Sequence, residues 1–549
     1  MFVSLSLIQH CRIKCPLLRV VIPACSPPNA CGDKPWRDSS NKAWMPAFAG
    51  MTTRIRTLIY AELCLVCRRF MESHGVIAAA LVLLCLLAAG CTVGPDYVRP
   101  TTLTPEAFKE TPEWKVAQPM DDVTRGAWWE IFNDPQLNSL AEQVDISNQN
   151  IVAAEAQFRQ ARALVQAARS AYFPTVAAGP SVTRSRSSGN LGAGVITRAG
   201  ISSDYLLTGN ASWEPDIWGK IRRTVEASKA GAQASAADLE AARLSAQAEL
   251  AQDYFELRTL DAQKQLLDET VVAYGKFLDL TKNRYTSGVA SSADVLQAET
   301  QLKTTQAQAI DVGVQRAQFE HAIASLMGKP ASVFTLPFEP IAIVPPTIPA
   351  GVPSQLLERR PDIAAAERLA AAANAQIGVA IAAYYPNITL SAAGGFEATS
   401  FATWFAWPSR LWSVGAAVSE TIFDAGLRKA QTDQARAVYD ASVAAYRQTV
   451  LTGFQQVEDN LAALRILEDE ARVQEEAVLA ARQSVTVTTN QYKAGTVSAL
   501  NLVTVQTIAL SDEVTAVNIL GRRMTACVLL IKALGGGWKA SDLPSAADL

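Results

Sequence analysis

Ten consecutive residues, Tyr205-Leu206-Leu207-Thr208-Gly209-Asn210-Ala211-Ser212-Trp213-Glu214, alternate between two kinds of side chain. One set of alternate positions carries Tyr, Leu, Gly, Ala and Trp, and the other carries Leu, Thr, Asn, Ser and Glu. Successive side chains of a β-strand point to opposite faces of the sheet, so the pattern predicts a strand with one apolar face. Alternation over about ten residues with aromatic ends is typical of a membrane β-strand. A soluble sheet with one face in water alternates in the same way.

The same alternation returns in the second half of the chain, at 387–392 and 412–419. We expect about four such strands, with a Gly/Ser-rich loop over 187–203 and an aromatic loop over 397–410 as candidate extracellular ends. An open sheet cannot stand in lipid, because its edge strands leave backbone N–H and C=O groups unpaired. Four strands are too few to close a barrel of eight or more. If these strands lie in a membrane, several chains share one barrel, and three chains supply twelve strands.

The chain also repeats itself. Residues 284–289 (RYTSGV) recur as 491–496 (QYKAGT), which places Gly495 at an offset of 207 from Gly288 (495 minus 288). Two copies at so long a period indicate a duplicated domain rather than a solenoid. We expect each copy to contain a helix, a strand pair, a very long helix, a turn and a second helix.

Long stretches without proline predict unusually long helices. No proline lies between Pro215 and Pro330, or between Pro408 and Pro544. Residues 219–283 alone would form a helix about 98 Å long at ~1.5 Å per residue. The 4-3-4 spacing of apolar residues over 267–278 is that of a coiled-coil contact, while other faces carry Ala, Gln, Thr and Ser. Such helices suit an ordinary coiled coil or the wall of a water-filled tube.

Composition argues against several functions. The net charge is −3 and charged residues make up 18% of the chain, so nothing points to nucleic acid. His321 is the only histidine beyond position 91, and Cys64-x-x-Cys67 has no second cysteine pair after it. The sequence has no GxxxxGK[ST] loop for a nucleotide. We therefore expect no catalytic residue, no metal site and no cofactor.

The start of the mature chain is marked by a short apolar run. Residues 76–89 carry no charge, which suits a signal peptide and is too short for a membrane-spanning helix. The run leads into Leu87-Ala88-Ala89-Gly90-Cys91, which resembles a lipobox, so 71–90 is the predicted lipoprotein signal peptide and Cys91 the predicted lipidation site. Residues 1–70 show no sustained periodicity, and we expect them to be a spurious or unstructured extension before a start at Met71.

Several motifs in order resemble the outer membrane factor family, the TolC-like and OprM-like channels, and within it the NodT-type lipoproteins of RND efflux systems. The motifs are 91–97 (CTVGPDY), 128–137 (WWEIFNDPQL), 212–219 (SWEPDIWG), 356–363 (LLERRPDI), 366–367 (AE) and 385–388 (YPNI).

The resemblance implies a mixed α and β membrane protein. Long α-helices would form a trimeric periplasmic α-barrel, and four β-strands per chain would contribute to a twelve-stranded β-barrel in the outer membrane. The predicted parts are a first repeat over 91–329, a Pro-rich equatorial linker over 330–361, a second repeat over 362–534 and a C-terminal tail over 535–549.

The resemblance also implies a function. The chain would be the outer-membrane channel subunit of a tripartite efflux system, lipid-anchored and extending into the periplasm. Its homotrimer would passively conduct drugs or other small solutes handed over by an inner-membrane RND pump and a periplasmic membrane fusion (adaptor) protein. One alternative is a type I secretion channel for proteins. Another is a periplasmic coiled-coil adaptor, which would lack the alternating segments.

In the family, the turns between the long helices form the periplasmic tip. Tyr285, Gly288 and Gly495 match the turns that contact the adaptor. The predicted gate consists of Asp294, Tyr492 and Asn501, with Tyr492 bonded to Asp294 in the closed state. Asn501 and Thr504 stand where TolC has two Asp, so the carboxylate ring is incomplete. The alternative for Asp294 is a negative charge favoured by the helix dipole at a helix N-terminus.

Overall fold

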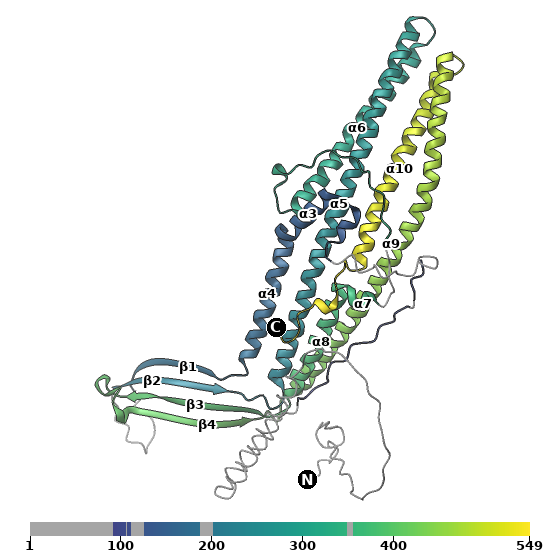
Figure 1. Cartoon of the computed structure of the whole chain (residues 1–549). Helices are drawn as coiled ribbons and strands as arrows, with labels where there is room; N and C mark the ends of the chain where they lie inside the picture. Colours follow the sequence, from purple (N-terminus) through teal and green to yellow (C-terminus); the bar gives the residue numbers. More distant parts are fainter. Residues whose placement is uncertain (1–91, 106, 111–125, 187–200, 349–354) are drawn as a thin grey trace, which may run out of the picture. The chain divides into compact units, whose positions relative to one another are not determined.

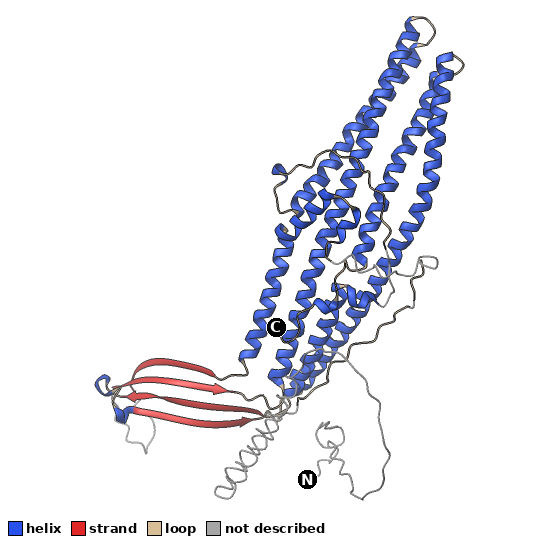
Figure 2. Cartoon of the chain, in the orientation of Figure 1, coloured by secondary structure: helices blue, strands red, loops and turns tan. Residues whose placement is uncertain are grey.

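The computed structural model describes residues 92–105, 107–110, 126–186, 201–348 and 355–549. The predicted extension 1–70, the signal peptide 71–90 and Cys91 lie outside the described residues. Within the described part, long helices dominate and four strands form one sheet (Figure 2). The helices are η1 (Trp128–Phe132), α3 (Pro135–Ser147), α4 (Gln149–Ser170), α5 (Lys220–Thr286), α6 (Ser292–Leu326), η2 (Ala331–Val333), α7 (Leu356–Arg359), α8 (Pro361–Ala382), η4 (Phe401–Thr403), η5 (Trp407–Ser409), α9 (Leu427–Ala494), α10 (Ala499–Ala533) and η6 (Ala540–Asp542).

The sheet is antiparallel, with its strands in chain order: β1 (Thr175–Arg186), β2 (Ile201–Trp213), β3 (Asn387–Ala398) and β4 (Arg410–Ser419). The predicted strand segments 205–214, 387–392 and 412–419 coincide with β2, β3 and β4, apart from Glu214. The strands hold 12, 13, 12 and 10 residues, enough to cross a bilayer when tilted, which takes about 9–11 residues. β1 and β4 are the edges of this sheet within the described chain.

The register gives the sheet two different faces. Directly paired residues of antiparallel strands share a face. One face is apolar along most of its length and carries Arg184, Arg186 and Arg410 at one end. Its apolar residues are Val176, Ala178, Pro180 and Val182 of β1, Tyr205, Leu207, Gly209, Ala211 and Trp213 of β2, Ile388, Leu390, Ala392, Gly394 and Phe396 of β3, and Trp412, Val414, Ala416 and Val418 of β4. The other face carries mostly small and polar side chains, among them Ser181, Thr183, Thr208, Asn210, Ser212, Thr389, Ser391, Ser413 and Ser419.

Each half of the chain contains the same succession of elements. α4 and α8 both have 22 residues, and α6 and α10 both have 35. α5 has 67 residues and α9 has 68, so each is about 100 Å long at ~1.5 Å per residue. The absence of proline within these helices allows the backbone hydrogen bonds to continue without a break.

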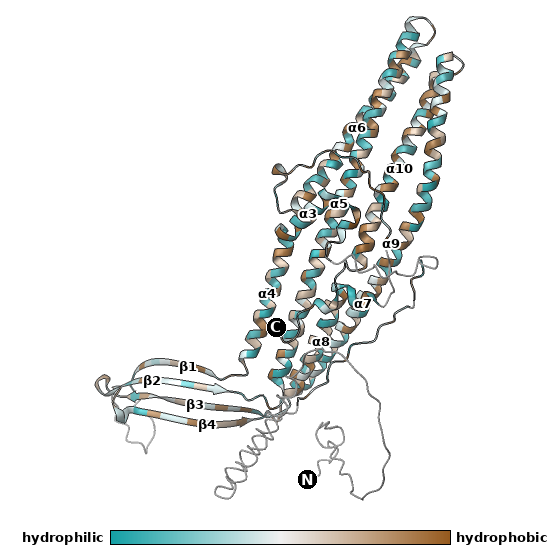
Figure 3. Cartoon of the chain, viewed as in Figure 1, coloured by the Kyte–Doolittle hydropathy of each residue, from teal (hydrophilic) through white to brown (hydrophobic). Residues whose placement is uncertain are grey.

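The long helices lie side by side in a row (Figure 1). Toward the helix turns, α5 and α10 pack in the middle, with α6 against α5 and α9 against α10. Nearer the strands, α4, α5, α8 and α9 follow one another in the same way. Polar and apolar residues are mixed along these helices (Figure 3). α10 is apolar and long enough to cross a bilayer, but core helices share that property, and part of α10 lies in the chain's own core.

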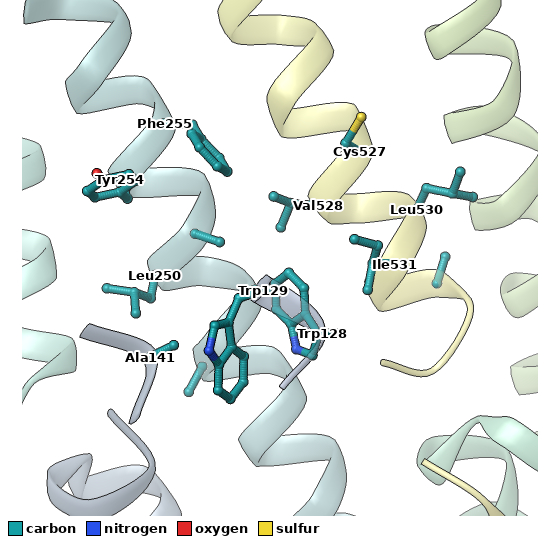
Figure 4. Packing of buried hydrophobic residues seen from close by; sticks show 14 of the residues in the cluster. Trp128, Trp129, Ala141, Leu250, Tyr254, Phe255, Cys527, Val528, Leu530 and Ile531 are labelled. Carbon is teal, nitrogen blue, oxygen red and sulfur yellow. The ribbon is translucent and has the colours of Figure 1, made fainter. Parts of the chain in front are cut away.

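The main core lies where η1 and α3 pack against the middle of α5 and the end of α10 (Figure 4). Trp128 and Trp129 lie in this core with Phe255 and Val528. The rings of Trp128 and Trp129 meet edge to face, with their centroids 5.9 Å apart. The Trp128 indole donates a 3.0 Å hydrogen bond to Gln247 Oε1. Burial of side chains this large stabilises the fold by about 2–3 kcal/mol each. The WWEIF segment therefore holds the two repeats together at this level.

The described N-terminal segment runs as an extended strap along the helices. Val93 N donates to the Trp218 carbonyl at 3.2 Å, so the segment starts beside the turn between β2 and α5. Gly94 has φ +98°, and a Cβ there would meet the Gly378 backbone at 2.5 Å, so the strap lies directly on α8. The Tyr97 hydroxyl donates to Glu367 Oε1 at 2.6 Å. Burial and this carboxylate raise the pKa of Tyr97 above its usual range.

The predicted C-terminal tail packs against α4 and α5. Leu549 is buried against Val165 and Ala232, and Lys229 Nζ donates to the Ala546 carbonyl at 2.6 Å. This segment thus belongs to the folded body of the chain.

Candidate functional site

The two turns between the long helices form the candidate site. α5 ends at Thr286, and α6 begins at Ser292. α9 ends at Ala494, and α10 begins at Ala499. The motifs RYTSGV and QYKAGT thus lie where each long helix reverses, as predicted from the resemblance.

Both turns depend on a glycine. Gly288 has φ +76° and Gly495 has φ +79°, in the left-handed region that side chains with a Cβ rarely adopt. The reversal lets Val289 N donate to the Arg284 carbonyl at 2.8 Å, and Thr496 N to the Gln491 carbonyl at 3.0 Å. These hydrogen bonds satisfy carbonyl groups that would otherwise have no partner at the end of the helix.

Tyr492 joins the two turns. Its side chain is 3% exposed, and its ring meets Phe277 edge to face at 5.4 Å. Its hydroxyl lies 3.2 Å from Thr281 Oγ1, and Arg284 of the other turn lies over its ring at 4.7 Å. Arg284 also donates to the Tyr492 carbonyl at 2.9 Å. An aromatic residue with these contacts holds the α5–α6 hairpin against the α9–α10 hairpin.

The equivalent residue of the first copy has a different environment. Tyr285 is 50% exposed, whereas Tyr492 is buried. The two repeats therefore use the same tyrosine differently, one as a contact within the chain and the other as part of an open surface. Val289 beside it is also 65% exposed, so this turn offers apolar area to a partner.

Asp294 has a local role in this conformation. Its carboxylate accepts from Ser291 N and from Ser291 Oγ, both at 2.9 Å, and its own N–H is bonded to Ser291 Oγ at 3.2 Å. This reciprocal pair is a capping box at the start of α6. The bond between Asp294 and Tyr492 implied by the family's closed state is replaced here by separate partners, Ser291 and Thr281. The geometry matches the alternative interpretation of Asp294 as a helix-end carboxylate.

Asn501 occupies the matching position in α10. Asn501 N is 3.4 Å from Ser498 Oγ, so the Ser498 side chain caps the start of α10. Unlike the capping box of Ser291 and Asp294, this cap is not reciprocal. Thr504, the next residue of the predicted constriction, bonds to the Leu500 carbonyl of its own helix at 2.8 Å. Both side chains are exposed and uncharged.

Arg284 was missed by sequence reasoning. It stands opposite Gln491 in the repeat alignment, so the break in symmetry between RYTSGV and QYKAGT was the available signal. Its partners lie 208 and 209 residues away, and no local pattern identifies them.

Two long helical hairpins with paired turns, continued by strands that form a sheet with one apolar face, define a class of protein: an outer-membrane channel. The comparisons agree. The family model described as outer membrane efflux protein matches residues 140–329 and 352–536. The chain belongs to this family.

The toluene efflux pump outer membrane protein TtgC of Pseudomonas putida is 30% identical over 463 residues, which cover 84% of this chain and 95% of TtgC. The pyoverdine export outer membrane protein OpmQ of Pseudomonas aeruginosa is 28% identical over 465 residues, covering 84% and 97%. The solved outer-membrane channel OprN superposes with a TM-score of 0.76 at 31% identity, covering 82% of this chain and all of OprN. The open state of the Neisseria gonorrhoeae channel MtrE gives 0.72 at 28% identity, covering 83% and 100%.

The protein is therefore an outer-membrane channel of tripartite efflux systems, and the predicted family, location and general function are confirmed. The strands also exclude the alternative of a periplasmic coiled-coil adaptor without alternating segments.

Proposed function

We propose that three copies of this chain form one conduit, with a twelve-stranded β-barrel in the outer membrane and a tube of helices below it. The open edges of the sheet carry this proposal, because β1 and β4 each leave one row of backbone groups without a strand partner in the described chain. In lipid such edges are satisfied only if the barrel closes. Pairing β4 of one copy with β1 of the next closes it without any new element.

The flanks of the helix row support the same assembly. α9 carries exposed apolar residues along its length: Val438, Leu451, Ile466, Val473, Leu479 and Val487. α6, on the other flank, exposes Leu296, Ile310 and Val314. Such stripes favour association because their burial removes apolar area from water. The flank of one copy would cover the opposite flank of the next, and the helices would close a tube around water.

The channel would conduct small organic solutes. The named relatives belong to toluene efflux and pyoverdine export systems, so we propose small molecules as the substrate class rather than secreted proteins. An inner-membrane RND pump would supply the energy, and a periplasmic adaptor would bind the exposed turn at Tyr285 and Gly288 and its counterpart at Gly495. The chain itself would catalyse no reaction and need no cofactor.

The gate would lie at the same turns. Tyr492 holds the two hairpins of one chain together, while Asp294 and Asn501 lie in the first turns of α6 and α10. Opening would separate these hairpins, so contacts at Tyr492 would favour the closed state. Asn501 and Thr504 provide no negative charge, and we expect weaker cation selectivity than a double carboxylate ring would give.

Cys91 would anchor each copy to the membrane through lipid. Thr92 lies next to Gly219, six residues after the end of β2, so the described chain begins near the proposed membrane surface. We expect labelled palmitate to be incorporated into the wild-type chain and lost in Cys91→Ser. Stable anchoring needs more than one acyl chain, which a triacylated cysteine supplies. Incorporation that persists in the variant would contradict this assignment.

The assembly can be tested by mass measurement and conductance. In mild detergent the purified protein should have three times the mass of its mature chain, and it should conduct ions in planar bilayers. Deleting the gene should increase susceptibility to small organic solvents and drugs, and the wild-type gene should restore resistance. A monomer that conducts ions would contradict the shared barrel.

A further inference from the structure

The charged side chains of the four described strands lie near one end of the sheet, with the two signs on opposite faces. Arg184 and Arg186 of β1 and Arg410 of β4 share the apolar face. Asp204 of β2 and Glu397 of β3 lie on the polar face. The other strand ends, Thr175, Trp213, Asn387 and Ser419, are uncharged. The face that would meet lipid is therefore purely cationic at one end.

The three arginines are available for a ligand. All three are exposed, and within the described part of the chain no carboxylate forms a salt bridge with any of them. Arg410 donates from Nε to the Trp407 carbonyl at 3.0 Å, and its guanidinium lies over the Trp407 ring. Stacking on an aromatic ring orients a guanidinium while leaving its other donors free.

The cationic end is the outer end if the proposed membrane position is correct, on which this inference rests. The uncharged ends of β2 and β4 lead into α5 and α9, which would extend into the periplasm. In the proposed trimer β4 of one copy lies beside β1 of the next. Arg410 would then share each seam of the barrel with Arg184 and Arg186 of a neighbouring copy.

We propose that this cationic end binds the phosphate groups of lipid A in the outer leaflet of the outer membrane. Guanidinium groups match phosphate with two parallel hydrogen bonds, and they do so best where water is partly excluded. Aromatic side chains next to the arginines, Tyr205, Phe396 and Trp412, lie where an aromatic belt meets the headgroups. If this face met only water, placing Asp204 and Glu397 on the opposite face would not stabilise the sheet.

The test uses the purified full-length channel in mild detergent with a chelator present, so that divalent cations do not bridge phosphates. Binding of diphosphorylated lipid A and of enzymatically dephosphorylated lipid A is followed by native mass spectrometry. Wild type should bind the phosphorylated form at least about tenfold more tightly than the dephosphorylated form, because several charge-assisted hydrogen bonds to phosphate contribute at least this much affinity. The triple variant Arg184→Gln, Arg186→Gln, Arg410→Gln should lose this preference.

A matched control replaces three exposed helix arginines, Arg159, Arg436 and Arg472, by Gln and should keep the preference. Equal binding of the two lipid forms by wild type, or an unchanged preference in the strand variant, would overturn the inference. Binding of inorganic phosphate by wild type, without a preference between the two lipid forms, would instead identify a site for a free anion and would also overturn the inference. Conductance of the same samples is measured in parallel. A failure of the proposed channel function would appear as a loss of conductance, whereas a failure of the lipid A site would appear only as a loss of lipid preference.

Discussion

Tyr492→Ala is expected to separate the two helix turns and to make the channel leak in the absence of its pump and adaptor. The ring is buried against Phe277 and lies under Arg284, so its removal leaves a cavity between the hairpins. Large aromatic to Ala changes in a core cost ~3–5 kcal/mol, and we expect about 3 kcal/mol per chain at this peripheral site. If opening breaks this contact, the closed state loses on the order of a hundredfold in population for each chain, at ~1.4 kcal/mol per decade.

The repeat supplies the control. Tyr285→Ala changes the equivalent residue of the first copy, which is half exposed, and should leave the leak close to wild type. Tyr492→Phe keeps the ring and removes only the bond to Thr281, so it should also leak little. Single-channel open probability in planar bilayers and uptake of bulky antibiotics measure the effect. Equal leak in Tyr492→Ala and Tyr285→Ala would show that burial of Tyr492 does not hold the gate closed.

The variant Asp294→Ala, compared with Ser291→Ala, distinguishes two roles of the Asp294 carboxylate, as a gate contact or as a helix cap. Loss of a capping interaction costs ~0.5–2 kcal/mol, whichever of the two partners is removed. We expect Asp294→Ala to raise the single-channel open probability. If Asp294 acts through the capping box, Ser291→Ala should raise the open probability by the same amount as Asp294→Ala. An effect of Asp294→Ala without one of Ser291→Ala would assign the carboxylate to a gate contact formed in another conformation.

The sequence predicted the parts of the fold that are specified by local periodicity. β2 and β4 follow from an alternation of period two, and the long helices follow from proline-free segments with helical spacing. β1 was not identified as a separate segment, because Gly179 and Pro180 interrupt its pattern. Within the sheet of one chain β1 is an edge strand, so Pro180 interrupts no pairing between two neighbouring strands of the same chain.

The candidate site shows the same division. The turns were predicted because the repeated motif contains the glycine that each reversal requires. The contact of Tyr492 with Arg284 was not predicted, because the two residues belong to different repeats and lie 208 residues apart. The role of Asp294 was open between two interpretations, since a carboxylate near a helix start can serve either one.

Val414→Arg should prevent assembly in the membrane, whereas Ser413→Arg at the adjacent position should be tolerated. Val414 lies in the middle of β4 on the apolar face, opposite Ala392, and it is 77% exposed in one chain. An arginine at the lipid-facing midplane of a barrel costs ~2–4 kcal/mol, so three copies would lose about 6–12 kcal/mol.

Ser413 lies on the polar face, opposite Ala393, and would face the water-filled interior of the proposed barrel. Ser413→Arg should therefore insert normally, but three added positive charges in the pore should lower its cation conductance. Membrane fractionation and native mass give the assembly state, and planar bilayers give the conductance. If Val414→Arg formed stable trimers in the outer membrane while Ser413→Arg did not, the faces of the sheet would be assigned the wrong way round. Equal assembly of both variants would mean that neither face of the sheet meets lipid, because a lipid-facing arginine is costly and a pore-facing one is not.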